Sequence, residues 1–246
     1  MMPARALIAA LFAALPPLAG AQGANLDWAL EPGGAAVAVD ARGEVYTTRW
    51  AQAPGAALLV ARRGSDGQLR WERATGQPPA DRHEVAQALA VDSQGRAVVA
   101  GTLRSGTQNP VNVHGFVAQL GPKGTLRWRQ ELSQAFDGSR TRRLLVGPQD
   151  QVSVLGLGIG PTGLVAQVTR LDADGVRLWQ WSDPQGLGAP EQLKPAADGG
   201  LLVTLRAATA NAVVRLDAQG QALWTWRGTT TLVTGDAAMD DSGHAY

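Results

Sequence analysis

The sequence predicts an all-β protein built from four imperfect repeats, each with four short strands. A Gly-x-x-x-Trp phrase recurs four times, at intervals of 57, 51 and 45 residues. Short apolar runs end in Asp-x-x-Gly phrases, and no long stretch after residue 22 keeps the 3.6-residue period of an amphipathic helix. The tryptophans of the recurring phrase are Trp71, Trp128, Trp179 and Trp224.

The Asp-x-x-Gly phrases predict tight turns between the first and second strands of each repeat. An Asp side chain accepts hydrogen bonds from the backbone just after it, and Gly adopts a positive φ without steric cost. The clearest copies of this phrase contain Asp40, Gly43, Asp92 and Gly95. The repeats cover about residues 31–75, 84–133, 142–182 and 191–228, with a partial repeat at 235–246.

Four short strands in a repeat of 40 to 50 residues are typical of a β-propeller blade. Each repeated Trp falls in the outer strand, where it is expected to wedge between neighbouring blades. Trp28 lies 43 residues before Trp71 and is interpreted as the last strand of a preceding unit. We therefore expect about four full blades with partial blades at both ends. Because the last repeat stops at Tyr246, a fragment of a six- to eight-bladed ring is favoured over a small ring with one incomplete blade.

Two sets of phrases resemble known bacterial propeller repeats. Residues 171–179 (LDADGVRLW) and 216–224 (LDAQGQALW) look like quinoprotein-like (PQQ-type) repeats. Residues 90–95 (AVDSQG) and 116–120 (FVAQL) also look like the secreted repeats called SBBP. The resemblance covers roughly residues 25–246 and implies the fold rather than one activity. A PQQ-type enzyme implies calcium-binding acids, a catalytic Asp and often a Cys pair. This chain has no Cys and no place for the calcium set, so no cofactor is expected.

The N-terminus predicts a secretory signal peptide over residues 1–21. Arg5 precedes an apolar stretch at 6–15, two prolines follow it, and Ala19 and Ala21 supply the small residues of a cleavage site. Cleavage after Ala21 would leave residues 22–246 in the periplasm or outside the cell. The apolar stretch is too short to span a bilayer, and no later run approaches 18 apolar residues, so no transmembrane segment is expected.

Composition and motifs argue against several functional classes. The net charge of +1 gives no field to attract nucleic acid. The absence of Cys excludes disulfides and thiol catalysis, and the three His, which are His83, His114 and His244, show no metal-binding spacing. No Gly-x-Ser-x-Gly elbow is present, nor a Gly-x-Gly-x-x-Gly between a strand and a helix. We therefore predict no metal site.

The loops before the first strand of each blade carry the candidate ligand-binding residues. In a propeller these loops share one face, and Arg binds carboxylate or phosphate through paired hydrogen bonds. The candidates are Arg82, His83, Glu84, Arg140, Arg142, Arg143 and Glu191. The alternative is that these Arg and acids pair with one another across blades. The leading hypothesis is a non-enzymatic module that presents this face to a protein, peptide or glycan. The second is a periplasmic enzyme, quinoprotein-like or a hydrolase or lyase, with its site at the channel mouth.

Overall fold

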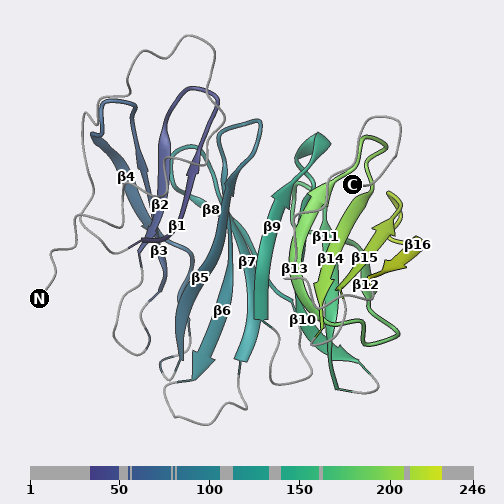
Figure 1. Cartoon of the computed structure of the whole chain (residues 1–246). Coiled ribbons are helices and arrows are strands. Elements are labelled where there is room, and N and C mark those ends of the chain that lie inside the picture. The colour runs from purple at the N-terminus through teal and green to yellow at the C-terminus, as the bar shows by residue number, and fades with distance from the viewer. Residues whose placement is uncertain are drawn as a thin grey trace, which may run out of the picture. The chain divides into compact units, whose positions relative to one another are not determined.

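The computed structural model describes residues 34–49, 55, 57–78, 80, 82–105, 113–132, 140–160, 163–207 and 211–228. The described residues form four antiparallel sheets of four strands each, in the strand order of the chain (Figure 1). This confirms the prediction of an all-β fold made of four-stranded propeller blades. The predicted signal peptide, Trp28 and the partial repeat at 235–246 lie outside the described residues.

Each blade runs from an inner first strand to an outer fourth strand. The first blade contains β1 (Gly34–Val39), β2 (Val45–Arg49), β3 (Leu59–Arg63) and β4 (Leu69–Ala74). The second contains β5 (Arg82–Val91), β6 (Ala97–Ser105), β7 (Val113–Leu120) and β8 (Leu126–Glu131). The third contains β9 (Arg140–Val146), β10 (Val152–Gly160), β11 (Gly163–Leu171) and β12 (Arg177–Ser182). The fourth contains β13 (Ala189–Pro195), β14 (Leu201–Arg206), β15 (Asn211–Leu216) and β16 (Ala222–Arg227).

The hairpin turns form for local reasons that the sequence carries. The carboxylate of Asp40 accepts hydrogen bonds from the amides of Arg42 and Glu44, both at 2.9 Å. Gly43 closes this turn with φ +76°. The turn between β11 and β12 repeats the device, because Asp172 accepts from two later amides. These side-chain bonds replace backbone bonds that the chain reversal leaves unmade.

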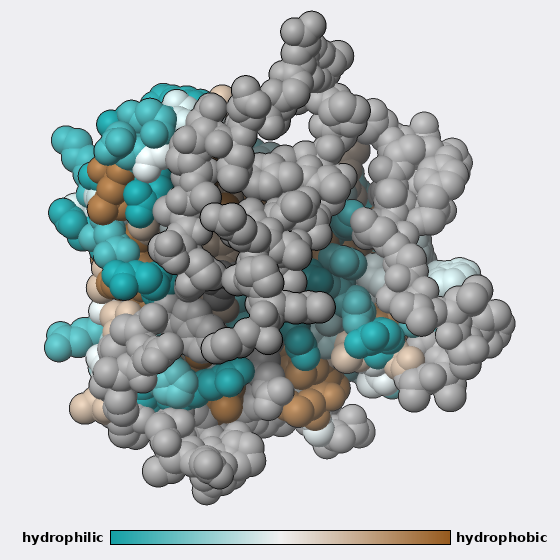
Figure 2. All heavy atoms as spheres, turned by 60° about the vertical axis from the view of Figure 1, so that its left-hand side comes forward, coloured by the Kyte–Doolittle hydropathy of each residue, from teal (hydrophilic) through white to brown (hydrophobic). Residues whose placement is uncertain are grey.

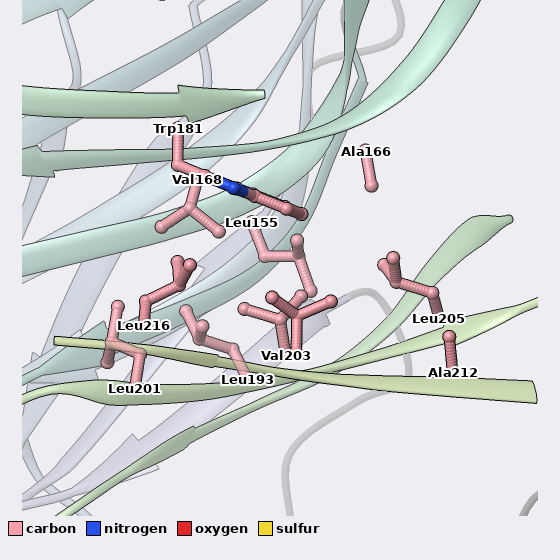
Figure 3. Packing of buried hydrophobic residues seen from close by; sticks show 11 residues of the cluster. Leu155, Ala166, Val168, Trp181, Leu193, Leu201, Val203, Leu205, Ala212 and Leu216 are labelled. Atoms are coloured by element: carbon pink, nitrogen blue, oxygen red, sulfur yellow. The ribbon is translucent and has the colours of Figure 1, made fainter. Parts of the chain in front are cut away.

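The hydrophobic core lies between blades rather than inside them. Consecutive inner strands contact one another, with β1 beside β5, β5 beside β9, and β9 beside β13. Figure 3 shows Trp181 and Val168 of blade 3 facing the leucines of blade 4, including Leu193 and Leu205. The sheets bury their apolar faces against the next sheet, which is how repeat architectures gain stability. Figure 2 shows a described surface that is mainly hydrophilic, with separate apolar patches.

A repeated contact, which we call the Trp–Gly clasp, joins each blade to the next. The outer-strand Trp of one blade lies over the Gly of the third-to-fourth-strand turn of the following blade. Its indole N–H donates to the carbonyl two residues before that Gly. The three clasps are Trp71 to Pro122 (2.9 Å) over Gly124, Trp128 to Ala173 (3.1 Å) over Gly175, and Trp179 to Ala218 (2.9 Å) over Gly220.

A second kind of link joins blades 2 and 3 at the first-to-second-strand turns. Asp150 ends the short 3₁₀ turn η2 (Pro148–Asp150) with φ +59°. Its carboxylate accepts from the Ser93 amide and from Arg96 of blade 2, both at 2.9 Å. Arg96 also pairs with Asp92, which is 6% exposed. The buried carboxylate of Asp92 therefore has charge-assisted hydrogen-bond partners, and it holds the turn between β5 and β6 in place.

Candidate functional site

Each inner strand carries a β-bulge at the same place in its blade. In β5 the bulge falls at Gln87, in β9 at Arg142 and in β13 at Glu191, where the register with the second strand shifts by one residue. The register of β1 shifts between Gly34 and Val37. A bulged residue is left out of the ladder and its side chain is re-aimed, which is why bulges are frequent near functional sites.

The bulged residues of blades 2, 3 and 4 are all polar, although the inner strands around them are largely apolar. Gln87 and Arg142 are exposed, and Glu191 is half-buried. Since β5 contacts β9 and β9 contacts β13, the three positions stand on consecutive strands. We define the bulge site as Gln87, Arg142, Arg143, Glu191, Gln192 and Arg206.

One hydrogen bond between blades 3 and 4 and two contacts within those blades hold part of the bulge site in place. The Nε of Arg143 donates to Oε1 of Gln192 at 3.2 Å, and its Nη1 donates to the carbonyl of Arg142 at 3.1 Å. Glu191 forms an ion pair with Arg206 at 2.8 Å. These contacts fix two guanidinium groups and leave the Arg142 side chain without a hydrogen bond or ion pair to any described residue.

The charge of the bulge site favours an anion. Three guanidinium groups stand against the single carboxylate of Glu191, which gives a net charge of +2. The exposed guanidinium of Arg142 can present two parallel N–H donors to a carboxylate or phosphate. The neighbouring Arg143 adds positive potential, while its Nε and Nη1 donate to the protein. The arrangement could therefore accommodate an anionic group beside Arg142.

The structure brings together only some of the residues that the sequence singles out. Arg142, Arg143 and Glu191 lie in the bulge site. Arg82 and His83 are half-buried at the start of β5, opposite Ser105 and Arg104 of β6. The backbone of Arg140 begins β9, whereas its side chain lies outside the described part of the chain.

Glu84 lies in the interior, 1% exposed, between blades 1 and 2. Its Oε2 accepts from the Leu58 amide at 2.9 Å and from the hydroxyl of Thr75. Its Oε1 approaches Nη1 of Arg129 as an ion pair without hydrogen-bond geometry. The guanidinium of Arg129 in turn stacks 4.4 Å from the ring centre of Phe116. This network gives Glu84 a role at the blade interface.

Sequence reasoning missed Gln87, Gln192 and Arg206 as site residues. Gln87 carried a usable signal, since it is the one polar residue in the run from Val85 to Val91. Arg206 carried none, because it ends β14 and reaches Glu191 only through sheet pairing. Among the described residues, no group of three His, Cys, Asp or Glu could hold a metal ion. In the same part of the chain, no helix is long and apolar enough to cross a membrane.

Comparisons with known proteins support the fold. No protein-family model matches the chain, and no curated protein sequence does. The Dos1 propeller structure is 12% identical, with a TM-score of 0.54, over 86% of this chain and 64% of that chain. The Hadza microbial sialidase Hz136 is 13% identical, with a TM-score of 0.51, over 75% and 44% of the two chains. Prolyl oligopeptidase B from Galerina marginata is 10% identical, with a TM-score of 0.51, over 82% and 28%.

These similarities show the propeller fold and nothing finer. The identities are too low to carry an activity from one chain to another, since one fold hosts many functions. This chain spans less than two thirds of the length of each of these structures. The narrower resemblance to PQQ-type and SBBP repeats remains a prediction.

Proposed function

We propose that this chain is a non-enzymatic propeller module that binds a carboxylate group of a protein, peptide or acidic glycan at the bulge site. The observation that carries the proposal is Arg142. It is exposed on a β-bulge of an inner strand, and its side chain has no partner among the described residues, whereas the guanidinium groups of Arg143 and Arg206 each have one. A scaffold that exposes a guanidinium group without a partner among the described residues is suited to recognition.

The carboxylate is the shared chemistry of the partners proposed for this face. An acidic side chain, a peptide C-terminus and a uronic acid all offer two coplanar oxygens that match the guanidinium fork. Glu191 within the bulge site would repel a second negative charge, so the site is suited to one carboxylate group of a ligand at a time. The ion pair of Glu191 with Arg206 reduces that repulsion without removing it.

Binding of two simple polymers tests this proposal. The probes are poly-L-glutamate and polygalacturonate, with neutral dextran as the reference, and the readout is titration calorimetry at about 50 mM and 200 mM salt. We expect both acidic polymers to bind, with weaker binding at the higher salt. Arg142→Ala should weaken binding about tenfold or more, and Arg142→Lys should recover only part of it, because Lys lacks the planar fork.

The matched control is Arg42→Ala. Arg42 is exposed at the turn between β1 and β2, at the opposite ends of the strands from the loops before the first strands. The Arg42→Ala variant removes the same charge as Arg142→Ala and leaves the bulge site unchanged. Equal losses in Arg42→Ala and Arg142→Ala would show that the polymers respond to overall charge, and the proposal would fail. Failure of both polymers to bind would have the same consequence.

We further propose that the module works outside the cytoplasm, after cleavage behind Ala21, and that its blades are of the PQQ-type and SBBP kind. The support is the residue pattern at 1–21 and the repeated phrases of the blades. Mass spectrometry of the protein secreted or released from the periplasm tests export. A mature N-terminus at Gln22 is expected, and an intact N-terminus in the cytoplasm would refute it.

A further inference from the structure

The outward side of blade 4 repeats the Trp half of the clasp. Trp224 stands opposite Arg215 in the register of β15 and β16, as Trp179 stands opposite Arg170 in blade 3. The two indoles therefore point to the same side of their sheets. Among the tryptophans in complete clasps, Trp71 is buried and Trp128 and Trp179 are half-buried, whereas Trp224 is 38% exposed. The clasp position of blade 4 is thus incompletely covered.

A second tryptophan extends this surface. Trp226 stands opposite Val213, in the position that Trp181 takes opposite Val168 in blade 3. Trp181 is 8% exposed because it belongs to the core between blades 3 and 4, while Trp226 is 56% exposed. Trp224 and Trp226 are two residues apart on one strand, so their side chains share one face of the sheet.

The charge beneath the two indoles is already balanced. Arg215 is 4% exposed, and its guanidinium pairs with Asp198 and with the Leu216 carbonyl. It therefore offers no strong attraction for an anionic ligand. The exposed surface is aromatic, and the indole N–H of Trp224 is a hydrogen-bond donor. In the other three blades the equivalent indole N–H donates to a backbone carbonyl of the following blade.

We propose that the face formed by Val213, Trp224 and Trp226 is a docking surface for a β-hairpin of a partner polypeptide with an Asp-x-x-Gly type turn. The argument is continuity with the three established interfaces. In each clasp the nearest indole ring atom lies 2.5 to 2.9 Å from the position that a β-carbon on the turn Gly would occupy. This distance is too short for a side chain, so only Gly fits. The carbonyl two residues earlier accepts the indole hydrogen bond.

The clasp geometry favours a hairpin over a sugar chain as the occupant. A hairpin supplies the carbonyl, the flat glycine surface and a strand edge at once, in the arrangement that this chain uses three times. The docking surface is separate from the bulge site, since β16 is the outer strand and β13 the inner strand of blade 4. Binding at one can therefore be lost without loss at the other.

A peptide with the sequence of the chain's own turn tests this inference with the full-length protein. The probe is a cyclised peptide of residues 163–182, the blade 3 hairpin whose Gly175 and Ala173 carbonyl contact Trp128 of blade 2 in the protein. We expect calorimetry to show binding. Replacing Gly175 with Val in the peptide should weaken it about tenfold or more, because the added side chain meets the indole.

Protein variants locate the binding. Trp224→Ala should weaken binding of the peptide about tenfold, and Trp224→Phe should weaken it less, because the ring remains while the N–H donor is lost. Leu178→Ala is the control, since Leu178 is 48% exposed on the outer strand of blade 3. The inference is overturned if the cyclised peptide does not bind or if the Gly175→Val peptide binds equally well. Equal effects of Leu178→Ala and Trp224→Ala, or displacement of the peptide by cellohexaose, would overturn it too.

Discussion

The indole of Trp128 occupies the space that a β-carbon on Gly175 would need, with ring atoms 2.6 to 2.9 Å from that position. The two residues belong to consecutive blades. Packing of the Trp128 side chain of blade 2 therefore requires that residue 175 of blade 3 has no side chain. Gly175 also has φ +82°, a conformation that residues with a β-carbon rarely adopt. Turn geometry and blade packing therefore select glycine for two independent reasons.

Gly175→Ala is expected to lower the free energy of unfolding by about 2 to 4 kcal/mol, from backbone strain plus overpacking against Trp128. Gly186→Ala separates the two causes. Gly186 has φ +63°, but a β-carbon there meets nothing within 4 Å. That variant should cost only about 1 kcal/mol. Urea unfolding of both proteins measures the difference, and equal losses would show that Trp128 does not constrain Gly175.

Removal of the clasp tryptophans should have unequal effects on stability. Trp71→Ala should cost about 3 to 5 kcal/mol, because the side chain is 8% exposed and its N–H bond to Pro122 is lost. Trp224→Ala should cost about 1 kcal/mol, since Trp224 is 38% exposed. Chemical denaturation compares them. A loss at Trp224 as large as that at Trp71 would mean that Trp224 already has a full clasp partner.

The sequence predicted the blades well because their turns are local. Asp40 and Gly43 lie within four residues of each other, so one phrase specifies both the hydrogen bonds and the positive φ. The repeated Trp could likewise be placed in an outer strand from its spacing after a turn Gly. The partner of each indole was not predictable, because Trp128 and Ala173 are 45 residues apart and meet only through blade packing.

The candidate binding residues were expected in the loops before the first strands, whereas the structure places them within those strands, in β5, β9 and β13. Arg142 and Glu191 were chosen as loop residues, and the structure places them on bulges. The bulges depend on register with the second strand, which a single sequence does not reveal. Glu84 was grouped with the same loops, but the alternation of β5 turns it inward toward Arg129.

Glu84→Gln should destabilise the protein by about 2 to 4 kcal/mol. The change keeps the shape and a hydrogen-bonding group, but it leaves the mostly buried Arg129 without its counter-charge. Thermal or urea unfolding measures the loss. In the double variant Glu84→Gln with Arg129→Met, much of the stability should return, because the uncompensated charge is removed together with its partner.

Glu72→Gln is the matched control for that prediction. Glu72 pairs with Arg49 at 2.9 Å, and the Arg49 side chain is 59% exposed and the Glu72 side chain 32%. Exposed pairs contribute little, so the expected loss is below about 1 kcal/mol. If the Glu84 and Glu72 variants lost the same stability, the interface network around Glu84 would not be a structural anchor.

Tyr46 predicts how stability responds to alkaline pH. Burial raises the pKa of the Tyr46 hydroxyl to about 12, against an opposing effect from Arg62 and with further increases from Asp40 and Glu44. The hydroxyl donates to the Gly95 carbonyl of blade 2 at 3.1 Å, and the ring is fully buried. Because the folded-state pKa lies above the unfolded value near 10, the protonated hydroxyl contributes stability that is fully present below about pH 10. That stability is lost as the pH rises from about 10 to 12.

Tyr46→Phe removes this group and keeps the ring. At pH 7 it should cost about 1 kcal/mol, the net value of one hydrogen bond. Between pH 10 and 11.5 the wild type should lose stability faster than the variant, by up to about 2 kcal/mol, and the two curves should converge or cross. Urea midpoints measured across this range provide the comparison. Parallel curves would show that Tyr46 ionises equally in the folded and unfolded states, which would contradict its burial between blades 1 and 2.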